Sequence, residues 1–234
     1  MKRFSIFLLF LIVGCALNAQ DDYRNYVLSR TMLNGTGTSY LDNITYYDGL
    51  GRPFQTVQKA VQSGLPVNKN LATLQEYDAA GREWNSWLPT FAGSSDYLAP
   101  AGIKSSAPGN YDNDSRPYSQ PVYKASPLNR LTAQYGPGAA WYNAGRPVKT
   151  EYLLNTNASP LKCIKYDVSS TGGLTGNSTT FYTSGELSVV KTTDEDLNVS
   201  YSFTDKQGRT VLTRQMNNSE EHDTYYCLLY TSDA

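Results

Sequence analysis

A five-residue pattern, Asp-x-x-Gly-Arg, occurs three times between strand-like flanks and constrains the fold more than any other feature. The copies are "YDGLGRP" from Tyr47, "YDAAGRE" from Tyr77 and "TDKQGRT" from Thr204. The flanking residues are aromatic, β-branched or alternate between apolar and polar, as in half-buried strands. Three fixed residues at this spacing should occur by chance in only roughly a few per cent of chains, so three copies indicate an internal repeat.

The chemistry of the pattern predicts a β-hairpin turn. An Asp at the start of a turn accepts backbone N–H groups, a Gly takes positive φ, and an Arg leaving the turn can pair with a carboxylate. We expect the aromatic residue before the Asp to stack on its counterpart in the next hairpin. A single hairpin is marginally stable, so successive copies should add edge to edge. The predicted structural turn residues are Asp48, Gly51, Arg52, Asp78, Gly81, Arg82, Asp205, Gly208 and Arg209.

The composition agrees with a β protein. Tyr (19), Gly (18) and Pro (11) favour short strands and turns, and an aromatic content of 12% argues against disorder. A formal net charge of -1 gives no bulk attraction to nucleic acid or anionic lipid. We therefore predict an all-β fold of stacked antiparallel hairpins with long irregular loops, and no nucleic-acid partner.

The N-terminus predicts export. A basic start, Lys2 and Arg3, is followed by an apolar run from Phe4 to Val13, and this run is shorter than the about 20 residues that span a bilayer. We interpret residues 1–19 as a signal peptide. Two processing routes remain open: a lipobox-like ending with lipidation of Cys15, or cleavage after Ala19. The protein is expected to be secreted or to lie in the cell envelope or outer membrane, with membrane contact only through a lipid anchor.

The repeats resemble those of a known family. A degenerate copy, "VYKASPLNRLTAQYGPG" from Val122, keeps the aromatic residue and an Asn-Arg turn exit, with Lys124 in place of the Asp. With "YYDGLGRP" and "LQEYDAAGREW", it resembles the YD repeats of the Rhs family of bacterial surface and toxin proteins. The resemblance extends from Tyr23 to Tyr226. It implies a truncated N-terminal fragment of a β-shell, whose partner is the rest of its own polypeptide, including a C-terminal effector, often a toxin.

We divide the chain by composition and strand signals. The expected parts are a β region at 20–89 with two hairpins, a Ser/Gly/Pro-rich loop or insertion at 90–121, and a β region at 122–226. The expected strands include Ser39–Tyr47, Pro147–Leu154 and Leu161–Val168, and any helix should be a short turn. The ending "CLLYTSDA" (227–234) leaves the pattern and can be encoded by a sequencing-library adaptor, so we interpret it as a non-native tail; a genuine terminus is the alternative.

No catalytic or metal site is evident from the sequence. Cys163 lies in strand-like sequence and is expected to be a small buried hydrophobe, and His222 lacks an accompanying nucleophile motif. The acidic run "TTDEDLN" from Thr192 lacks the ligand spacing of an EF-hand and is more typical of a solvated turn. We expect no cofactor and no metal.

Three functions remain open, and a non-enzymatic exported scaffold is favoured. The alternative is a cell-surface glycan-binding module that uses Trp84, Trp87 and Trp141. The third is a glycoside hydrolase, but no spacing singles out a pair of carboxylates.

Overall fold

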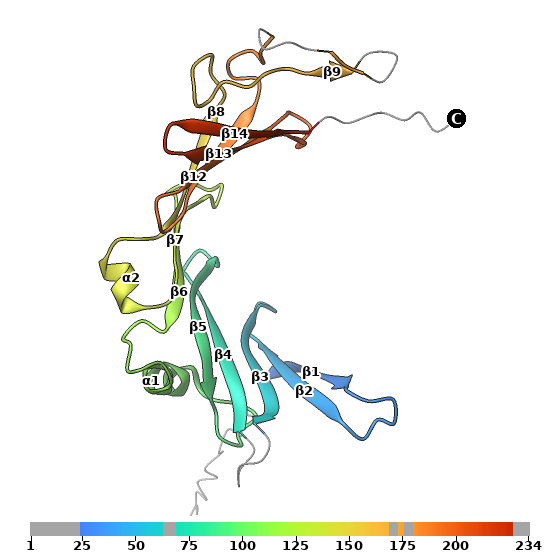
Figure 1. The fold of residues 1–234 in the computed structure, drawn as a ribbon. Helices are drawn as coiled ribbons and strands as arrows, with labels where there is room; N and C mark the ends of the chain where they lie inside the picture. The colour runs from blue at the N-terminus through green and yellow to red at the C-terminus, as the bar shows by residue number, and fades with distance from the viewer. Residues whose placement is uncertain (1–23, 63–68, 169–172, 176–179, 227–234) are drawn as a thin grey trace, which may run out of the picture.

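The computed structural model describes residues 24–62, 69–168, 173–175 and 180–226. In these residues the fold is all-β, as predicted: a 12-stranded open antiparallel sheet in which neighbouring strands follow chain order (Figure 1). Only β9 and β10 leave this order, because they pair with each other outside the sheet. The predicted signal peptide (1–19), Cys15 and the predicted tail (227–234) lie outside the described residues.

The first half of the sheet holds β1 (Asn25–Met32), β2 (Tyr40–Tyr47), β3 (Pro53–Gln62), β4 (Lys69–Tyr77), β5 (Glu83–Phe91) and β6 (Tyr118–Tyr123). The second half holds β7 (Leu131–Tyr135), β8 (Val148–Leu154), β11 (Ser188–Thr193), β12 (Val199–Thr204), β13 (Thr210–Asn217) and β14 (Glu220–Tyr225). The remaining elements are α1 (Pro100–Asn110), α2 (Ala139–Asn143), β9 (Asp167–Val168) and β10 (Leu174–Thr175).

The sheet bends into an arc with α1 and α2 on its outer side (Figure 1). In the described residues the buried apolar side chains form two clusters. One lies between β2–β5 and α1 and includes Val57, Ala72 and Ile103. The other lies over β11–β13 and includes Phe203 and Leu212. Pairing is shortest near the middle of the sheet, where β5 and β6 pair at only two positions, Ser86↔Ser119 and Trp87↔Tyr118, and β7 and β8 also pair at two.

Strand register assigns the side chains to two faces, because directly paired residues share a face. The outer face carries both buried clusters. The other, which we call the inner face, lies on the inside of the arc and is mostly uncharged and polar. Residues paired across neighbouring strands form rows on this face. One row in the first half is Thr45, Thr56 and Thr73. Two rows in the second half are Thr150, Thr192, Ser200, Gln215 and His222, and Tyr152, Val190, Ser202, Thr213 and Thr224.

The predicted loop at 90–121 was wrong in one respect, because it contains the 11-residue helix α1. Helix periodicity is hidden in the sequence by two glycines, two serines and an internal proline. Pro100 suits the first helical turn, and Ile103 and Ala107, four residues apart, are fully buried against the sheet. Lys104 also forms an ion pair with Glu76 of β4. Burial and this pairing therefore stabilise a helix that local propensity does not favour.

The predicted strand at Leu161–Val168 was also largely wrong. The structure has an isolated bridge, Ile164↔Phe181, and only the two residues of β9. The apolar signal came from side chains that lie over the outer face of the sheet, since Cys163 is buried and Leu161 packs beside it. The strand predictions at Ser39–Tyr47 and Pro147–Leu154 are confirmed by β2 and β8.

Candidate functional site: the turns along one edge of the sheet

The repeated turns share one hydrogen-bond pattern. In the first, the Asp48 N–H donates to the Arg52 carbonyl at 2.9 Å, and the Gly51 N–H donates to the Asp48 carbonyl at 3.0 Å. Asp48 Oδ1 accepts the backbone N–H groups of Leu50 and Arg52, both at 2.9 Å, while Oδ2 accepts Arg52 Nε at 2.8 Å. The same contacts recur in the turn of Asp78, Gly81 and Arg82 and in the turn of Asp205, Gly208 and Arg209. Each carboxylate is therefore occupied by its own turn.

Successive turns are connected by arginine–tyrosine contacts on the inner face. An arginine at the exit of a turn, where the next strand begins, lies over the ring of a tyrosine on the adjacent strand. The distances from guanidinium carbon to ring centroid are 4.2 Å for Arg52 and Tyr77, 4.5 Å for Arg82 and Tyr123, and 4.9 Å for Arg130 and Tyr152. The expected stacking of matching aromatic residues was wrong. Counterparts two strands apart are separated by about 10 Å, which exceeds ring-contact distance, whereas the turn arginine at the start of the intervening strand reaches the tyrosine ring of the adjacent strand.

Gly81 provides a test of this arrangement, with Gly51 as its matched control. Both have positive φ, 79° and 76°, so alanine at either should cost about 1–2 kcal/mol of unfolding free energy through backbone strain. A Cβ at Gly51 meets nothing within 4 Å, whereas at Gly81 it would lie 3.0 Å from Arg52 Nη1. We expect Gly81→Ala to be the more destabilising in urea denaturation, because it also displaces the guanidinium from Tyr77. Equal losses would show that this contact contributes nothing.

The degenerate turn between β6 and β7 has no Asp, but it keeps the backbone hydrogen bond that closes the repeated turns. The Lys124 N–H donates to the Arg130 carbonyl at 2.8 Å, across a longer turn than in the repeats. Asn129 has φ 50° and so takes the place of the glycine. Arg130 then makes the same kind of tyrosine contact as the arginines of the full repeats.

The acidic run at the β11–β12 connection is a further turn of the repeated type, and it lies at the opposite ends of the strands from the other turns. Asp194 Oδ1 accepts the N–H groups of Asp196 at 2.9 Å and Asn198 at 2.8 Å, and Asp194 Oδ2 accepts Asn198 Nδ2 at 2.8 Å. Leu197 has φ 70° at the position of the glycine. This relationship is not evident from the sequence, because Leu and Asn replace the Gly and Arg of the motif.

The turn carboxylates should make the fold acid-sensitive. The pKa of Asp48, Asp78 and Asp205 each lies below the ordinary 3.8, because the arginine backbone N–H and then its guanidinium donate to the charged form. Since the folded pKa is below the unfolded one, this stabilisation is present above about pH 4 and is lost as pH falls through the lower folded value. We expect urea denaturation to show a fall in unfolding free energy below about pH 4.

Exchanging all three aspartates for asparagine is the control for this prediction. Asparagine keeps an oxygen that accepts backbone N–H groups but cannot pair electrostatically with the arginine. The triple variant should be less stable at neutral pH and should lose less stability on acidification than the parent. If the triple variant loses as much unfolding free energy on acidification as the parent, the acid sensitivity comes from other carboxylates, such as Glu76, whose pKa is also lowered.

Asn155 closes the long connection between β8 and β11 in the manner of a turn. It is fully buried, its N–H donates to the Leu187 carbonyl at 3.1 Å, and its Oδ1 accepts the Leu187 N–H at 2.8 Å. Gly185, with φ 81°, donates to the Asn155 carbonyl at 3.0 Å. Asn155 Nδ2 donates to the Thr183 carbonyl at 2.9 Å. The intervening segment is thus an insertion into a repeat-like turn, and the insertion separates the turn residues in sequence.

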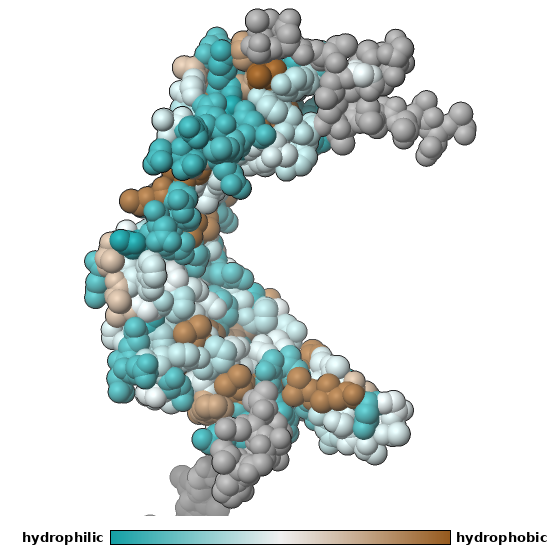
Figure 2. Space-filling model, viewed as in Figure 1, coloured by the Kyte–Doolittle hydropathy of each residue, from teal (hydrophilic) through white to brown (hydrophobic). Residues whose placement is uncertain are grey.

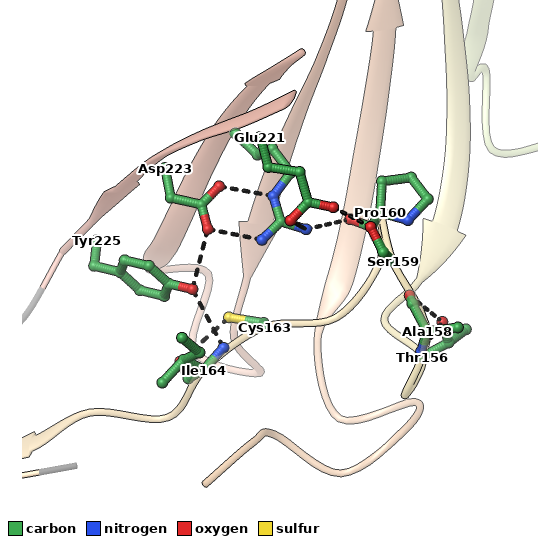
Figure 3. Close-up of polar contacts among 10 residues, drawn as sticks. Thr156, Ala158, Ser159, Pro160, Cys163, Ile164, Glu221, Asp223 and Tyr225 are labelled. Carbon is green, nitrogen blue, oxygen red and sulfur yellow. Dashed lines mark hydrogen bonds and ion pairs between the residues drawn. The ribbon is translucent and has the colours of Figure 1, made fainter. Parts of the chain in front are cut away.

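A buried arginine joins this insertion to the sheet (Figure 3). Arg214 of β13 is 3% exposed, and its Nε and Nη2 donate to the two carboxylate oxygens of Asp223, each at 2.7 Å. Its Nη1 donates to the Pro160 carbonyl at 2.6 Å and lies 3.0 Å from Glu221 Oε2. One guanidinium therefore connects β13, β14 and the inserted segment. The role of Arg214 was not predicted from the sequence, since a single arginine in an alternating strand resembles a solvent-facing one.

Two titratable groups beside Arg214 are kept neutral. Burial raises the pKa of Tyr225 to about 12, and its hydroxyl donates to Asp223 Oδ2 at 3.2 Å and accepts the Ile164 N–H at 3.4 Å. Burial also raises the pKa of the Cys163 thiol to about 12, which disfavours the reactive thiolate. This cluster therefore holds the chain in place rather than presenting a nucleophile.

The structure separates the other residues considered as sites. His222 is exposed on β14, and Trp87 donates to Glu76 at 2.9 Å while packing beside Tyr118. Trp141 is 47% exposed on α2. Within the described ranges, no three His, Cys, Asp or Glu residues are grouped so that they could hold a metal ion. Nor do these ranges contain a helix long and apolar enough to span a bilayer.

Residues 20–154 match the model of a protein family described as Domain of unknown function (DUF6443). The match spans more than half of the 234 residues, so the chain belongs to this family. It ends at Leu154, the last residue of β8, directly before the turn that holds the insertion. Searches of curated proteins and of solved structures found no match to the chain.

Proposed function

We propose that this chain is a non-enzymatic, exported scaffold, the N-terminal part of an Rhs-type wall of YD repeats. The remainder of the same polypeptide would supply further hairpins and a C-terminal effector, which the wall encloses or presents. The scaffold uses no cofactor, and the signal sequence directs it to the cell envelope or the exterior.

The observation that carries this proposal is the use made of the repeated carboxylates. Each turn Asp accepts two backbone N–H groups and the guanidinium of its own Arg, which lowers its pKa. A general acid needs a raised pKa, and a glycosidase needs two carboxyl groups facing across a substrate. The turn carboxylates instead lie in separate hairpins, each neutralised locally. Their arrangement suits a repeated structural corner.

The open edge of the sheet also favours a growing wall. Strands β2 to β8 and β11 to β14 follow one another laterally in chain order, and β14 is the last strand of the sheet in the part of the chain that the structure describes. A further hairpin could pair with β14 without disturbing any existing pair, because a sheet edge presents unused N–H and C=O groups. The arginine–tyrosine contacts provide the same connection from each hairpin to the next.

The test begins by reading the gene beyond codon 226. The proposal expects many further Asp-x-x-Gly-Arg hairpins followed by a terminal domain of different composition. In the full-length product that terminal domain should resist limited proteolysis, and Asp78→Ala together with Asp205→Ala should expose it. A native stop codon immediately after Ala234, or a terminal domain equally cleavable in both proteins, would refute the enclosed-effector function.

A second candidate function, binding of cell-surface glycans, rests on the surface around α2. Trp141 and Tyr142 are 47% and 38% exposed, and Arg116 lies over the Tyr142 ring at 3.4 Å. Exposed aromatic faces beside a cation can stack on the apolar faces of sugars. Glycan-array binding that is lost in Trp141→Ala and retained in Trp84→Ala would favour this function. Equal binding by both variants would exclude Trp141 as the platform.

A further inference from the structure

The first strand of the sheet has an open edge. β1 pairs with β2 along its whole length, from Asn25↔Tyr47 to Met32↔Tyr40, and its other side has no paired strand among the described residues. All 8 residues of β1 are exposed. The strand therefore presents a continuous row of backbone donors and acceptors that another strand could pair with.

The two outermost strands differ in how their edges are protected. β14 carries Glu220, Glu221 and Asp223, so two copies of this strand would repel each other. In β1 the only charged residue is Arg30, and Asp42 of β2 already pairs with it at 2.7 Å. β1 also contains no proline, and its pairing with β2 has no bulge. The usual devices that prevent edge pairing are therefore present on β14 and missing from β1.

The exposed side chains of β1 are unusually apolar. Tyr26, Val27, Leu28 and Met32 are 59%, 52%, 51% and 56% exposed. Figure 2 shows hydrophobic surface on the β1–β2 hairpin. An unpaired strand that is this apolar, and whose one charged residue is already in an ion pair, would be stabilised by a partner strand of matching pattern.

We propose that β1 pairs with β1 of a second copy of this chain, antiparallel and about a two-fold axis, to form a homodimer. In such a dimer, residues directly opposite each other lie on the same face of the sheet. Since side chains alternate between the faces along a strand, the two residue numbers of each pair must be both odd or both even, and their sum is even. Two registers centre the strand under this condition: Leu28 opposite Leu28 of the second copy, or Ser29 opposite Ser29. Each register pairs seven of the 8 residues of the strand with those of the second copy.

Neither register brings like charges together. With Leu28 at the axis, Tyr26 lies opposite Arg30 of the second copy, and this pairing is favourable. With Ser29 at the axis, Tyr26 lies opposite Met32 and Leu28 opposite Arg30. The sequence of β1 is therefore compatible with pairing to itself. This favours a second copy of the chain over an unrelated peptide as the partner strand. The pairing is closed by symmetry and should stop at two chains.

Light scattering coupled to size exclusion of the full chain tests the dimer. The parent should have the mass of two chains, and Leu28→Lys should raise the dimer dissociation constant by at least about tenfold, because two lysines meet at or near the axis. Leu50→Lys, at a turn tip that is 78% exposed, adds the same charge away from β1 and should leave the dimer intact. Circular dichroism should show all three proteins equally folded.

Cysteine crosslinking provides a second readout. A residue at the axis faces its own copy at a distance that a disulfide can bridge, so either Leu28→Cys or Ser29→Cys should give a disulfide-linked dimer, and Leu50→Cys should not. A single-chain mass for the parent, equal masses for Leu28→Lys and the parent, or no specific crosslink would overturn the proposal. So would a mass that keeps rising with concentration, since that indicates head-to-tail association between different edges.

Discussion

Replacing Arg214 by methionine should lower the free energy of unfolding by about 3 kcal/mol, because a buried ion pair loses one partner. The guanidinium is almost fully buried and contacts two carboxylates and the Pro160 carbonyl. Methionine fills a similar space but leaves Asp223 and Glu221 close together without a cation. Urea denaturation measures the loss. Trypsin cleavage at Lys162 or Lys165 should also accelerate, because the inserted segment loses its connection to the sheet.

Arg146→Met is the matched control for this prediction. Arg146 lies 3.5 Å from Asp196, but both side chains are at least half exposed. A solvated pair of this kind contributes about 1 kcal/mol or less. Equal losses in the two variants, or unchanged trypsin cleavage in Arg214→Met, would show that Arg214 does not hold the insertion.

Asn155→Ala should also cost about 3 kcal/mol, because a fully buried side chain is lost that satisfies the buried Leu187 N–H and also bonds the Thr183 carbonyl. The Leu187 N–H would lose its acceptor and the Thr183 carbonyl its donor, in a position with no exposed surface. Thermal and urea denaturation measure the effect. Asn34→Ala is the control, since Asn34 accepts two backbone N–H groups in an exposed turn, where water can replace the side chain.

Asn155→Asp separates the two hydrogen bonds. The carboxylate can still accept the Leu187 N–H, but at neutral pH it would face the Thr183 carbonyl without a proton to donate. We expect it to be destabilised at neutral pH and to recover relative to the parent as pH falls, because protonation restores a donor. A loss that does not change with pH would argue that the Thr183 contact is unimportant.

The local part of the architecture could be predicted from the sequence, because the turn motif contains its own partners. Asp48, Gly51 and Arg52 lie within five residues and complete one hydrogen-bonded unit without help from the rest of the chain. The all-β class followed from three such units and their flanks. The arginine–tyrosine contacts were not predicted, since the partners belong to successive hairpins and meet only through the lateral pairing of adjacent strands.

The parts that the sequence did not reveal depend on burial. α1 contains two glycines, two serines and an internal proline, which weaken its helix propensity, and it is stabilised by packing of Ile103 and Ala107 on the sheet. Asn155 and Gly185 form one turn although an insertion separates them, so no spacing rule could join them. Arg214 resembles a surface residue until the inserted segment is seen to cover it.

The hydroxyl and amide rows of the inner face would determine how strongly the proposed wall binds a domain enclosed by it. Thr, Ser and Gln side chains form hydrogen bonds that water provides equally well, and the turn arginines of the inner face already lie over tyrosine rings. If the chain is part of the proposed wall, we expect this lining to hold an enclosed domain by shape more than by adhesion, so that the domain can leave once the wall opens.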